Sequence, residues 1–117
     1  MRYSILIHES PEDFEARTDP AQQAELWDGV GRYLRALHEA GVFVGGAGLQ
    51  PPATATRLLL RDGRRVIQDG PYPDTKEQLG GLFLIEVPNL DVALEWAGRF
   101  PQRPGQVVEV RPTLPGD

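Results

Sequence analysis

The chain has 117 residues, 40% of them apolar and 25% charged, which predicts one soluble globular domain. A net charge of −5 with scattered arginines argues against nucleic-acid binding, and the absence of cysteine excludes disulfides and thiolate chemistry. No apolar run approaches the roughly 20 residues that span a bilayer, and the N-terminus lacks a signal-peptide pattern. We therefore expect a cytoplasmic protein with no membrane association.

The first third of the chain predicts a strand, a loop and a helix. Residues 2–8 are β-branched and aliphatic, as in a buried strand, whereas residues 9–19 are polar, contain a proline and predict a loop. Asp19 can cap a helix in which Gln22 completes a capping box, and Gly41 ends that helix in a left-handed conformation. The apolar residues that define its inner face are Leu26, Val30, Tyr33, Leu34 and Leu37.

The middle of the chain predicts strands. Residues 42–49 alternate apolar residues with glycines, which indicates a strand that something approaches closely. Residues 54–60 and 64–68 flank Asp62-Gly63, a strong signal for a β-hairpin.

The last third repeats the strand–helix–strand pattern. Residues 82–87 predict a strand, Asn89 caps a second helix, and residues 107–111 predict the last strand. We expect the inner face of this helix to be Leu90, Ala93, Leu94 and Ala97, with Trp96 on its flank.

This order predicts an α+β fold, a ferredoxin-like sandwich with an extra central β-hairpin. Two helices cover only one face of the sheet. We therefore expect a second copy to bury the other face, so that a homodimer encloses a barrel-like interior.

The first candidate site is the segment 69–81, which contains Lys76, the only lysine among twelve basic residues. A lysine can shift its pKa and lose its proton, whereas an arginine cannot. The alternative is a solvated lysine in a turn that pairs loosely with an acidic neighbour. The candidate catalytic residues of this segment are Asp69, Tyr72, Lys76 and Glu77.

Each of these residues has two interpretations. Lys76 could act as a base, but its acidic neighbours favour the charged form and therefore an electrostatic clamp on a substrate oxygen. Tyr72 could donate a proton or serve as an aromatic plug, Asp69 could cap the turn or border a pocket, and Glu77 could pair with Lys76 or share proton transfer. Gly80-Gly81 would allow a backbone conformation open mainly to glycine.

The second candidate site lies on the strands. His8 ends the first strand, where a strand end can open onto a pocket, and by alternation it shares a face with Ser4 and Leu6, opposite Tyr3, Ile5 and Ile7. Glu109 and Arg111 share a strand face and could line an ion-paired pocket or simply reach water. We take His8 and Arg111 as candidate substrate-binding residues, although a lone histidine is more often structural. His38 we interpret as structural, and two histidines in separate elements predict no metal and no cofactor.

The segment Asp69-Gly70-Pro71-Tyr72, followed by Thr75-Lys76-Glu77 and Gly80-Gly81, resembles the Asp-Gly-Pro-Phe signature of the DGPF proteins in the YCII-related superfamily. Residues 2–7, Gly41 with Gly48-Leu49, residues 93–97 and residues 108–112 also match, so that the resemblance covers nearly the whole chain. It implies a dimeric α+β barrel formed by a single YCII-related domain over residues 1–117.

For function, the resemblance implies two directions. Some relatives resemble small-molecule lyases with a His–Asp pair, but the helix histidine would fall near Val30, where this chain has none. Our first hypothesis is a dimer that binds a polar or aromatic metabolite and catalyses lyase-, isomerase- or dehydratase-type proton transfer. Lys76 would hold an oxyanion, Tyr72 would donate a hydrogen bond, and Asp69 or Glu77 would shuttle the proton. The second hypothesis is a non-catalytic regulatory module that binds a sigma factor, because other relatives are fused to or encoded beside one.

Overall fold

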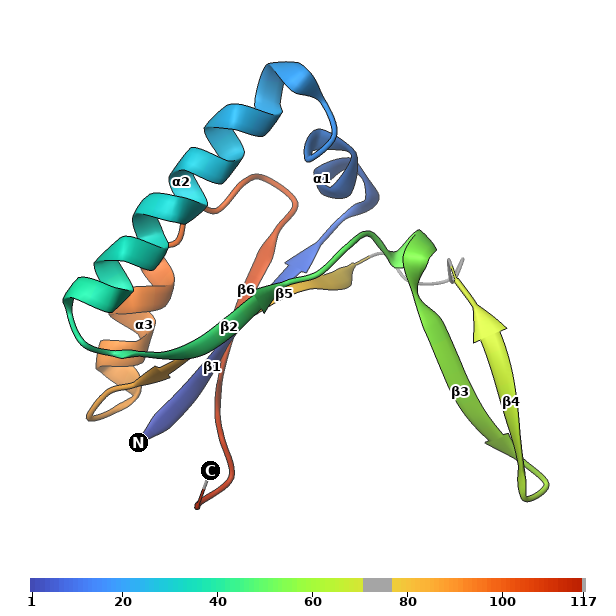
Figure 1. Ribbon diagram of the computed structural model, residues 1–117. Coiled ribbons are helices and arrows are strands. Elements are labelled where there is room, and N and C mark those ends of the chain that lie inside the picture. The colour runs from blue at the N-terminus through green and yellow to red at the C-terminus, as the bar shows by residue number, and fades with distance from the viewer. Residues whose placement is uncertain (71–76, 117) are drawn as a thin grey trace.

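The computed structural model describes residues 1–70 and 77–116 (Figure 1). No helix within these ranges is both long enough and apolar enough to cross a membrane. In chain order the elements are β1 (Arg2–Glu9), α1 (Pro11–Ala16), α2 (Pro20–Glu39), β2 (Phe43–Gly48), a 3₁₀ turn (Pro52–Thr54), β3 (Thr56–Arg61), β4 (Arg64–Asp69), β5 (Gln78–Glu86), α3 (Leu90–Gly98) and β6 (Val107–Pro112).

Four strands form one antiparallel sheet in the order β2-β5-β1-β6. Helix α2 connects β1 to β2, and helix α3 connects β5 to β6, so that each connection passes over one intervening strand. This arrangement confirms the predicted ferredoxin-like α+β fold. Strands β3 and β4 form a separate two-stranded sheet, the predicted extra hairpin.

The core lies between one face of the sheet and the helices α2 and α3 (Figure 1). Alternate residues of β1 point into it, as the period-two pattern predicted. Tyr33 of α2 meets Phe83 and Phe100 edge to face, with ring centroids 5.2 and 5.4 Å apart, and its hydroxyl donates to the carbonyl of Trp96 at 2.9 Å. The fully buried side chains at the centre are Ile5, Leu37 and Ile85.

The prediction of a loop over residues 9–19 was wrong for most of that range, because Glu9 ends β1 and α1 covers Pro11–Ala16. Ser10 caps α1 with a reciprocal capping box. Its hydroxyl accepts from the Asp13 N–H at 3.3 Å, and the Asp13 carboxylate accepts from the Ser10 N–H at 3.2 Å. Pro11 occupies the first helical turn, where its missing N–H has no cost, so that the proline marks a helix start rather than a loop.

Helix α2 begins and ends where the sequence predicted, and Asp19 caps it as predicted, but without the predicted capping box. Asp19 accepts from the N–H of Ala21 at 3.0 Å, and the Gln22 side chain donates to the Asp19 carboxylate at 2.7 Å. Gln22 therefore supports the capping side chain and does not complete a capping box through the backbone. Gly41 follows the helix with φ of 72°, the predicted left-handed conformation.

The predicted inner face of α3 was partly wrong. Ala93 and Ala97 are buried as expected, but Leu90 and Leu94 are 47% and 51% exposed. Trp96 instead packs against the core together with Val92. The helix is rotated toward the residue with the largest apolar ring, because aromatic side chains bury the most surface.

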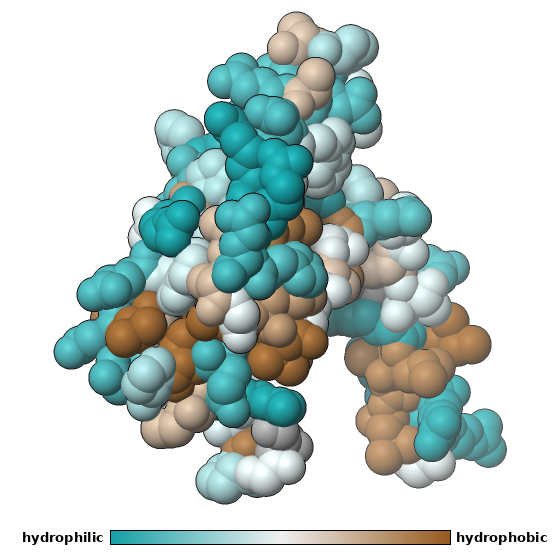
Figure 2. Space-filling view, turned by 60° about the vertical axis from the view of Figure 1, so that its left-hand side comes forward, coloured by the Kyte–Doolittle hydropathy of each residue, from teal (hydrophilic) through white to brown (hydrophobic). Residues whose placement is uncertain are grey.

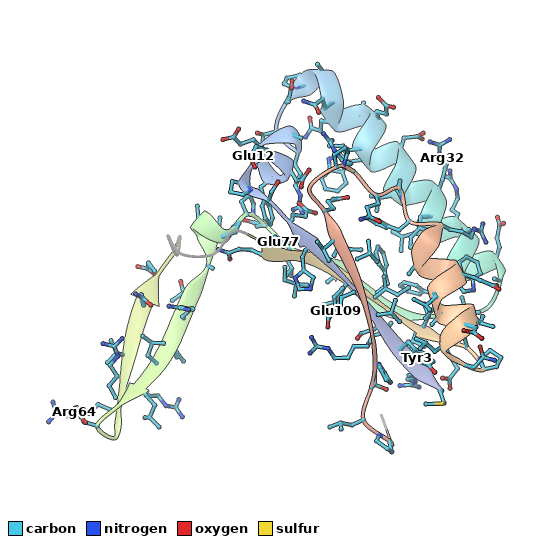
Figure 3. All side chains as sticks on the ribbon, turned by 180° about the vertical axis from the view of Figure 1, so that it is seen from behind. Tyr3, Glu12, Arg32, Arg64, Glu77 and Glu109 are labelled. Atoms are coloured by element: carbon cyan, nitrogen blue, oxygen red, sulfur yellow. The ribbon has the colours of Figure 1, made fainter. Side chains whose placement is uncertain are left out.

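We call residues 56–69, which comprise β3, β4 and their turn, the arm. Asp62 and Gly63 both adopt left-handed φ values, 51° and 76°, which is typical of the two-residue hairpin turn that the sequence predicted. The arm extends away from the four-stranded sheet, on the side opposite α2 and α3 (Figures 1 and 3). The radius of gyration is accordingly 16.0 Å, whereas a compact chain of this length has about 13 Å.

Candidate functional site

The face of the four-stranded sheet that α2 and α3 do not cover we call the open face. Residues opposite one another in register share a face, so the pairs of β1 with β5 and β6 define it. Its centre is apolar and half-buried, and polar side chains border it. Its residues on the three strands include Ser4, Leu6, His8, Leu82, Leu84, Glu109 and Arg111.

Three of these residues form a hydrogen-bonded group, the His8 cluster, which consists of His8, Glu109 and Arg111. The His8 Nε2 lies 2.9 Å from the Glu109 Oε1, although the two residues are 101 positions apart in the sequence. The Arg111 Nε donates to the other oxygen of Glu109 at 2.7 Å, and a terminal nitrogen of Arg111 bonds the same oxygen. Figure 3 shows Glu109 on β6, on the side of the sheet away from the helices. The Glu109 carboxylate therefore lies between an imidazole and a guanidinium.

The hydrogen bonds from His8 and Arg111 hold the pKa of Glu109 below its usual value of 4.5, so that Glu109 is a carboxylate at neutral pH. A carboxylate acceptor fixes the hydrogen of a neutral imidazole on Nε2 and leaves the lone pair on Nδ1. No other described residue bonds the His8 ring, whose side chain is 28% exposed. The His8 cluster can therefore accept a proton at Nδ1 and stabilise the resulting imidazolium through Glu109.

A β-bulge in β5 lies opposite the end of β1 that carries His8. Ile7 lies opposite Gly81 and His8 lies opposite Leu79, so Gly80 of β5 is the unpaired residue. Gly80 is buried, and an added Cβ there would meet the Glu9 carboxyl carbon at 2.6 Å and an Arg17 terminal nitrogen at 2.7 Å. The sequence predicted a special backbone conformation at Gly80-Gly81, but neither residue has a positive φ. Close side-chain packing explains why Gly80 has no side chain.

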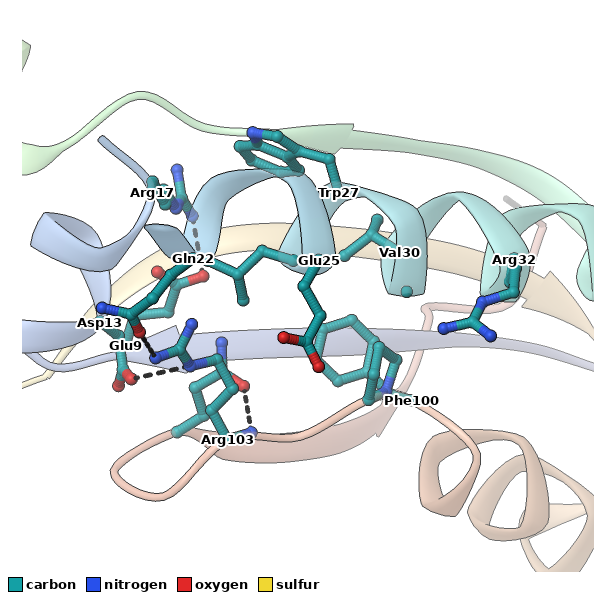
Figure 4. Close-up of a pocket in the computed structure, with 14 residues that line it drawn as sticks. Glu9, Asp13, Arg17, Gln22, Glu25, Trp27, Val30, Arg32, Phe100 and Arg103 are labelled. Carbon is teal, nitrogen blue, oxygen red and sulfur yellow. Dashed lines mark hydrogen bonds and ion pairs between the residues drawn. The ribbon is translucent and has the colours of Figure 1, made fainter. Parts of the chain in front are cut away.

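A cavity of about 350 Å³ lies on the helical side of the sheet, where α1, α2 and the segment 99–106 meet (Figure 4). Arg17 donates to Glu9 at 2.7 Å, to the carbonyl of Gly80 at 2.9 Å and to the carbonyl of Leu49. The lining residues labelled in Figure 4 include Glu9, Asp13, Arg17, Gln22, Glu25, Trp27, Phe100 and Arg103.

The charges of this cavity compensate one another. Glu9 and Asp13 are each 6% exposed, which is unusual for carboxylates, and each has an arginine partner. Arg103 donates to Gln22 at 2.7 Å and lies 4.0 Å from Asp13. The cavity is large enough for a small ligand, yet its buried ions already hold α1 and the segment 99–106 against the sheet. The sequence did not predict this cavity, because its lining residues come from separate segments of the chain that no motif connects.

Of the four residues predicted in the segment 69–77, the structure describes Asp69 and Glu77. Asp69 is exposed at the base of the arm, where its carboxylate accepts from the Thr56 hydroxyl at 3.0 Å. Glu77 is exposed and precedes Gln78, which lies opposite Glu9. Tyr72 and Lys76 lie outside the described residues. Among the predicted residues, the structure thus brings together His8 and Arg111, with Glu109 between them.

His38, predicted to be structural, stacks on Phe43 with ring centroids 4.2 Å apart. Within residues 1–70 and 77–116, no three histidine or carboxylate side chains gather in a way that could hold a metal ion.

The strand order and the crossing helices define an α+β protein of the ferredoxin-like class. Within this class, the chain belongs to the family of the YCII-related domain, whose model matches residues 1–115. It is also similar to an uncharacterized protein of Rhizobium meliloti (strain 1021), with 32% identity over 97 residues, which are 83% of this chain and 77% of that protein. The resemblance inferred from the sequence is thereby confirmed at the level of the family.

Proposed function

We propose that this protein binds a small polar or aromatic metabolite on the open face and catalyses proton transfer on it, in a reaction of the lyase, isomerase or dehydratase type. The observation that carries the proposal is the 2.9 Å contact between His8 Nε2 and Glu109. A histidine oriented by a carboxylate is a common general acid–base arrangement.

The surroundings of the His8 cluster favour a substrate with a polar group attached to an apolar body. Leu6 lies opposite both Glu109 and Leu82, so apolar side chains adjoin the charged group on the same face. Arg111, whose side chain is 65% exposed, can bind a carboxylate or an enolate oxygen with the edge of its guanidinium that Glu109 does not use.

In the proposed reaction, His8 Nδ1 removes a proton from a carbon or oxygen of the substrate, and Arg111 stabilises the negative charge that develops. Glu109 stabilises the imidazolium, which then returns the proton to another atom of the same substrate. The roles of Asp69, Tyr72, Lys76 and Glu77 stay predictions, and Lys76→Met tests whether the segment 69–77 contributes to binding or turnover.

The experiment begins with a thermal-shift screen against small carboxylic and aromatic acids, because a ligand specific for the folded state raises its stability. Ring resonances of the only two histidines, followed by NMR, should shift at His8 and not at His38. Incubation of each ligand in D₂O then reveals proton transfer as deuterium incorporation, without knowledge of the complete reaction.

We expect His8→Asn to abolish incorporation and Glu109→Gln to slow it by about 10²-fold or more. His38→Asn is the matched control and should leave the rate unchanged. Incorporation at the wild-type rate in His8→Asn would show that the His8 cluster does no proton transfer. The alternative prediction, a regulatory module, is tested by co-purification of a tagged copy with a sigma factor.

A further inference from the structure

The cavity on the helical side of the sheet, which we call the helical cavity, contains carboxylate oxygens that no described residue uses. Asp13 and Glu9 are each 6% exposed. The Asp13 Oδ2 accepts from the N–H and the hydroxyl of Ser10, at 3.2 and 2.8 Å. The Glu9 Oε1 accepts from Arg17 at 2.7 Å. The second oxygen of each carboxylate accepts no hydrogen bond from the described part of the chain, since the Nε of Arg103 lies 4.0 Å from the Asp13 Oδ1, beyond hydrogen-bond distance.

These two free oxygens border open space. Among the described residues, no polar side-chain atom is both fully buried and without a hydrogen-bond partner. Since Glu9 and Asp13 both line the helical cavity, their free oxygens are accessible to a molecule inside it.

Glu25 adds a third carboxylate to the helical cavity. Its side chain extends from α2 toward Phe100 (Figure 4), and no described residue forms a hydrogen bond or an ion pair with it. The arginines that line the cavity have other partners, because Arg17 pairs with Glu9, Arg103 with Asp13, and Arg32 with Asp28 of its own helix. The described lining thus contains one negative charge that no arginine compensates.

The wall of the helical cavity also has an apolar part. Leu26 and Val30 of α2 are half-buried and line it together with Phe100 and Pro101. An added Cβ at Gly29 would lie 3.4 Å from the Pro101 ring, so the two walls are in van der Waals contact there. Figure 2 shows mainly hydrophilic side chains over the upper part of the body, where α1 and the first half of α2 lie, so the apolar wall is set beneath a polar surface.

The free groups of the helical cavity favour an organic cation as the ligand. A carboxylate oxygen accepts hydrogen bonds and cannot donate them, whereas an ammonium group has three N–H donors and no acceptor. Bonds between the two are charge-assisted and therefore stronger than neutral ones. An anion would meet the uncompensated Glu25, and within residues 1–70 and 77–116 the carboxylates are not grouped in a way that could hold a metal ion.

We propose that the helical cavity binds a primary amine with an apolar body. The ammonium group donates to Glu25, and the free oxygens of Asp13 and Glu9 supply further acceptors in the same cavity. The apolar body packs on Phe100 and Val30, and the volume of about 350 Å³ is sufficient for a small ring or a short alkyl chain. This site lies on the opposite face of the sheet from the His8 cluster and does not depend on the proposed function.

Three probes of similar shape test the charge of the ligand. Benzylamine is a cation at neutral pH, benzyl alcohol is neutral, and benzoate is an anion. In an NMR titration of the whole chain, benzylamine should bind with a dissociation constant of about 10 mM or less and shift the amide resonances of Gly29 and Phe100. It should leave those of the His8 cluster unchanged. Benzyl alcohol and benzoate should bind at least about tenfold more weakly at the same resonances.

Substitutions of Glu25 test its role as the acceptor. Glu25→Gln should raise the dissociation constant of benzylamine at least about tenfold, because a neutral amide replaces the carboxylate. Glu25→Lys should abolish binding, since it places an ammonium in the cavity. The matched control is Glu39→Gln at the exposed end of α2, which removes the same charge away from the cavity and should change the constant less than about twofold. Glu25 is exposed, so the fold does not depend on it.

Several results would overturn the proposal. They are the absence of benzylamine binding up to about 10 mM, equal affinity for benzyl alcohol, and wild-type affinity in Glu25→Gln. Tighter binding of benzoate at the Gly29 and Phe100 resonances would show that Arg103 selects an anion instead. His8→Asn should bind benzylamine like the wild type, so that failure of the proposed chemistry and failure of the amine site give different results.

Discussion

Gly80→Ala should destabilise this chain, because its methyl group would displace a buried ion pair. The new Cβ would lie 2.6 Å from the Glu9 carboxyl carbon and 2.7 Å from an Arg17 terminal nitrogen, closer than real carbon contacts, so the ion pair must move. The Glu9 and Arg17 side chains are only 7% and 14% exposed. Arg17 also holds the carbonyls of Gly80 and Leu49.

The magnitude follows from what the methyl group displaces. Removal of one partner from a buried ion pair costs about 3–5 kcal/mol, and overpacking of a well-packed site costs about 1–3 kcal/mol. Both ions remain in Gly80→Ala and can rearrange in part. We therefore expect the free energy of unfolding to fall by about 2–4 kcal/mol.

Urea unfolding followed by circular dichroism, at one pH and one protein concentration, measures this loss. Gly48→Ala is the control, because Gly48 also lies in a strand of the same sheet but an added Cβ would meet nothing within 4 Å. That variant should be as stable as the wild type or up to about 1 kcal/mol more stable. Equal stability of the two variants would refute the argument that Gly80 is required by the Glu9–Arg17 pair.

Two further predictions concern pH. Burial raises the pKa of Tyr33 from 10 to about 12, so the stability that its neutral phenol contributes is complete below pH 10 and is lost as the pH rises through 12. Between pH 9 and pH 12, urea unfolding should show that the wild type loses about 2–3 kcal/mol more than Tyr33→Phe, and parallel losses would contradict this assignment. His8 and Arg111 lower the pKa of Glu109, so its contribution is complete above pH 4.5 and is lost as the pH falls through the lowered pKa. As the pH is lowered through the acid range, the urea midpoint of the wild type should therefore fall more steeply than that of Glu109→Gln. Equal dependence of the two midpoints on pH would argue against the hydrogen bonds of the His8 cluster.

Features set by neighbouring residues were predictable from the sequence. The Asp62-Gly63 turn, the left-handed Gly41 and the alternation along β1 each depend on local conformational preference. Pro11 misled the prediction because proline is typical of both loops and helix starts. The face of α3 was mistaken because two apolar stripes compete on one short helix.

The candidate site was only partly predictable, for a physical reason. His8 and Glu109 meet because β1 and β6 pair in one particular register, and no local pattern reveals which strands will be neighbours. The buried Glu9–Arg17 pair likewise depends on Gly80, which is far along the chain. Alternation did place His8 on the correct face, since it needs only the strand itself.

The position of β1 in the sheet has a consequence for the order of folding during synthesis. Both neighbours of β1 are late strands, since residues 2–9 pair with residues 78–86 and with residues 107–112. Strand β1 is therefore synthesised before either of its neighbours and has no strand to pair with until β5 has also been synthesised. Pairing at such sequence separation slows folding and leaves an apolar strand exposed meanwhile. We expect the nascent chain to depend on a chaperone that shields β1 until β5 emerges.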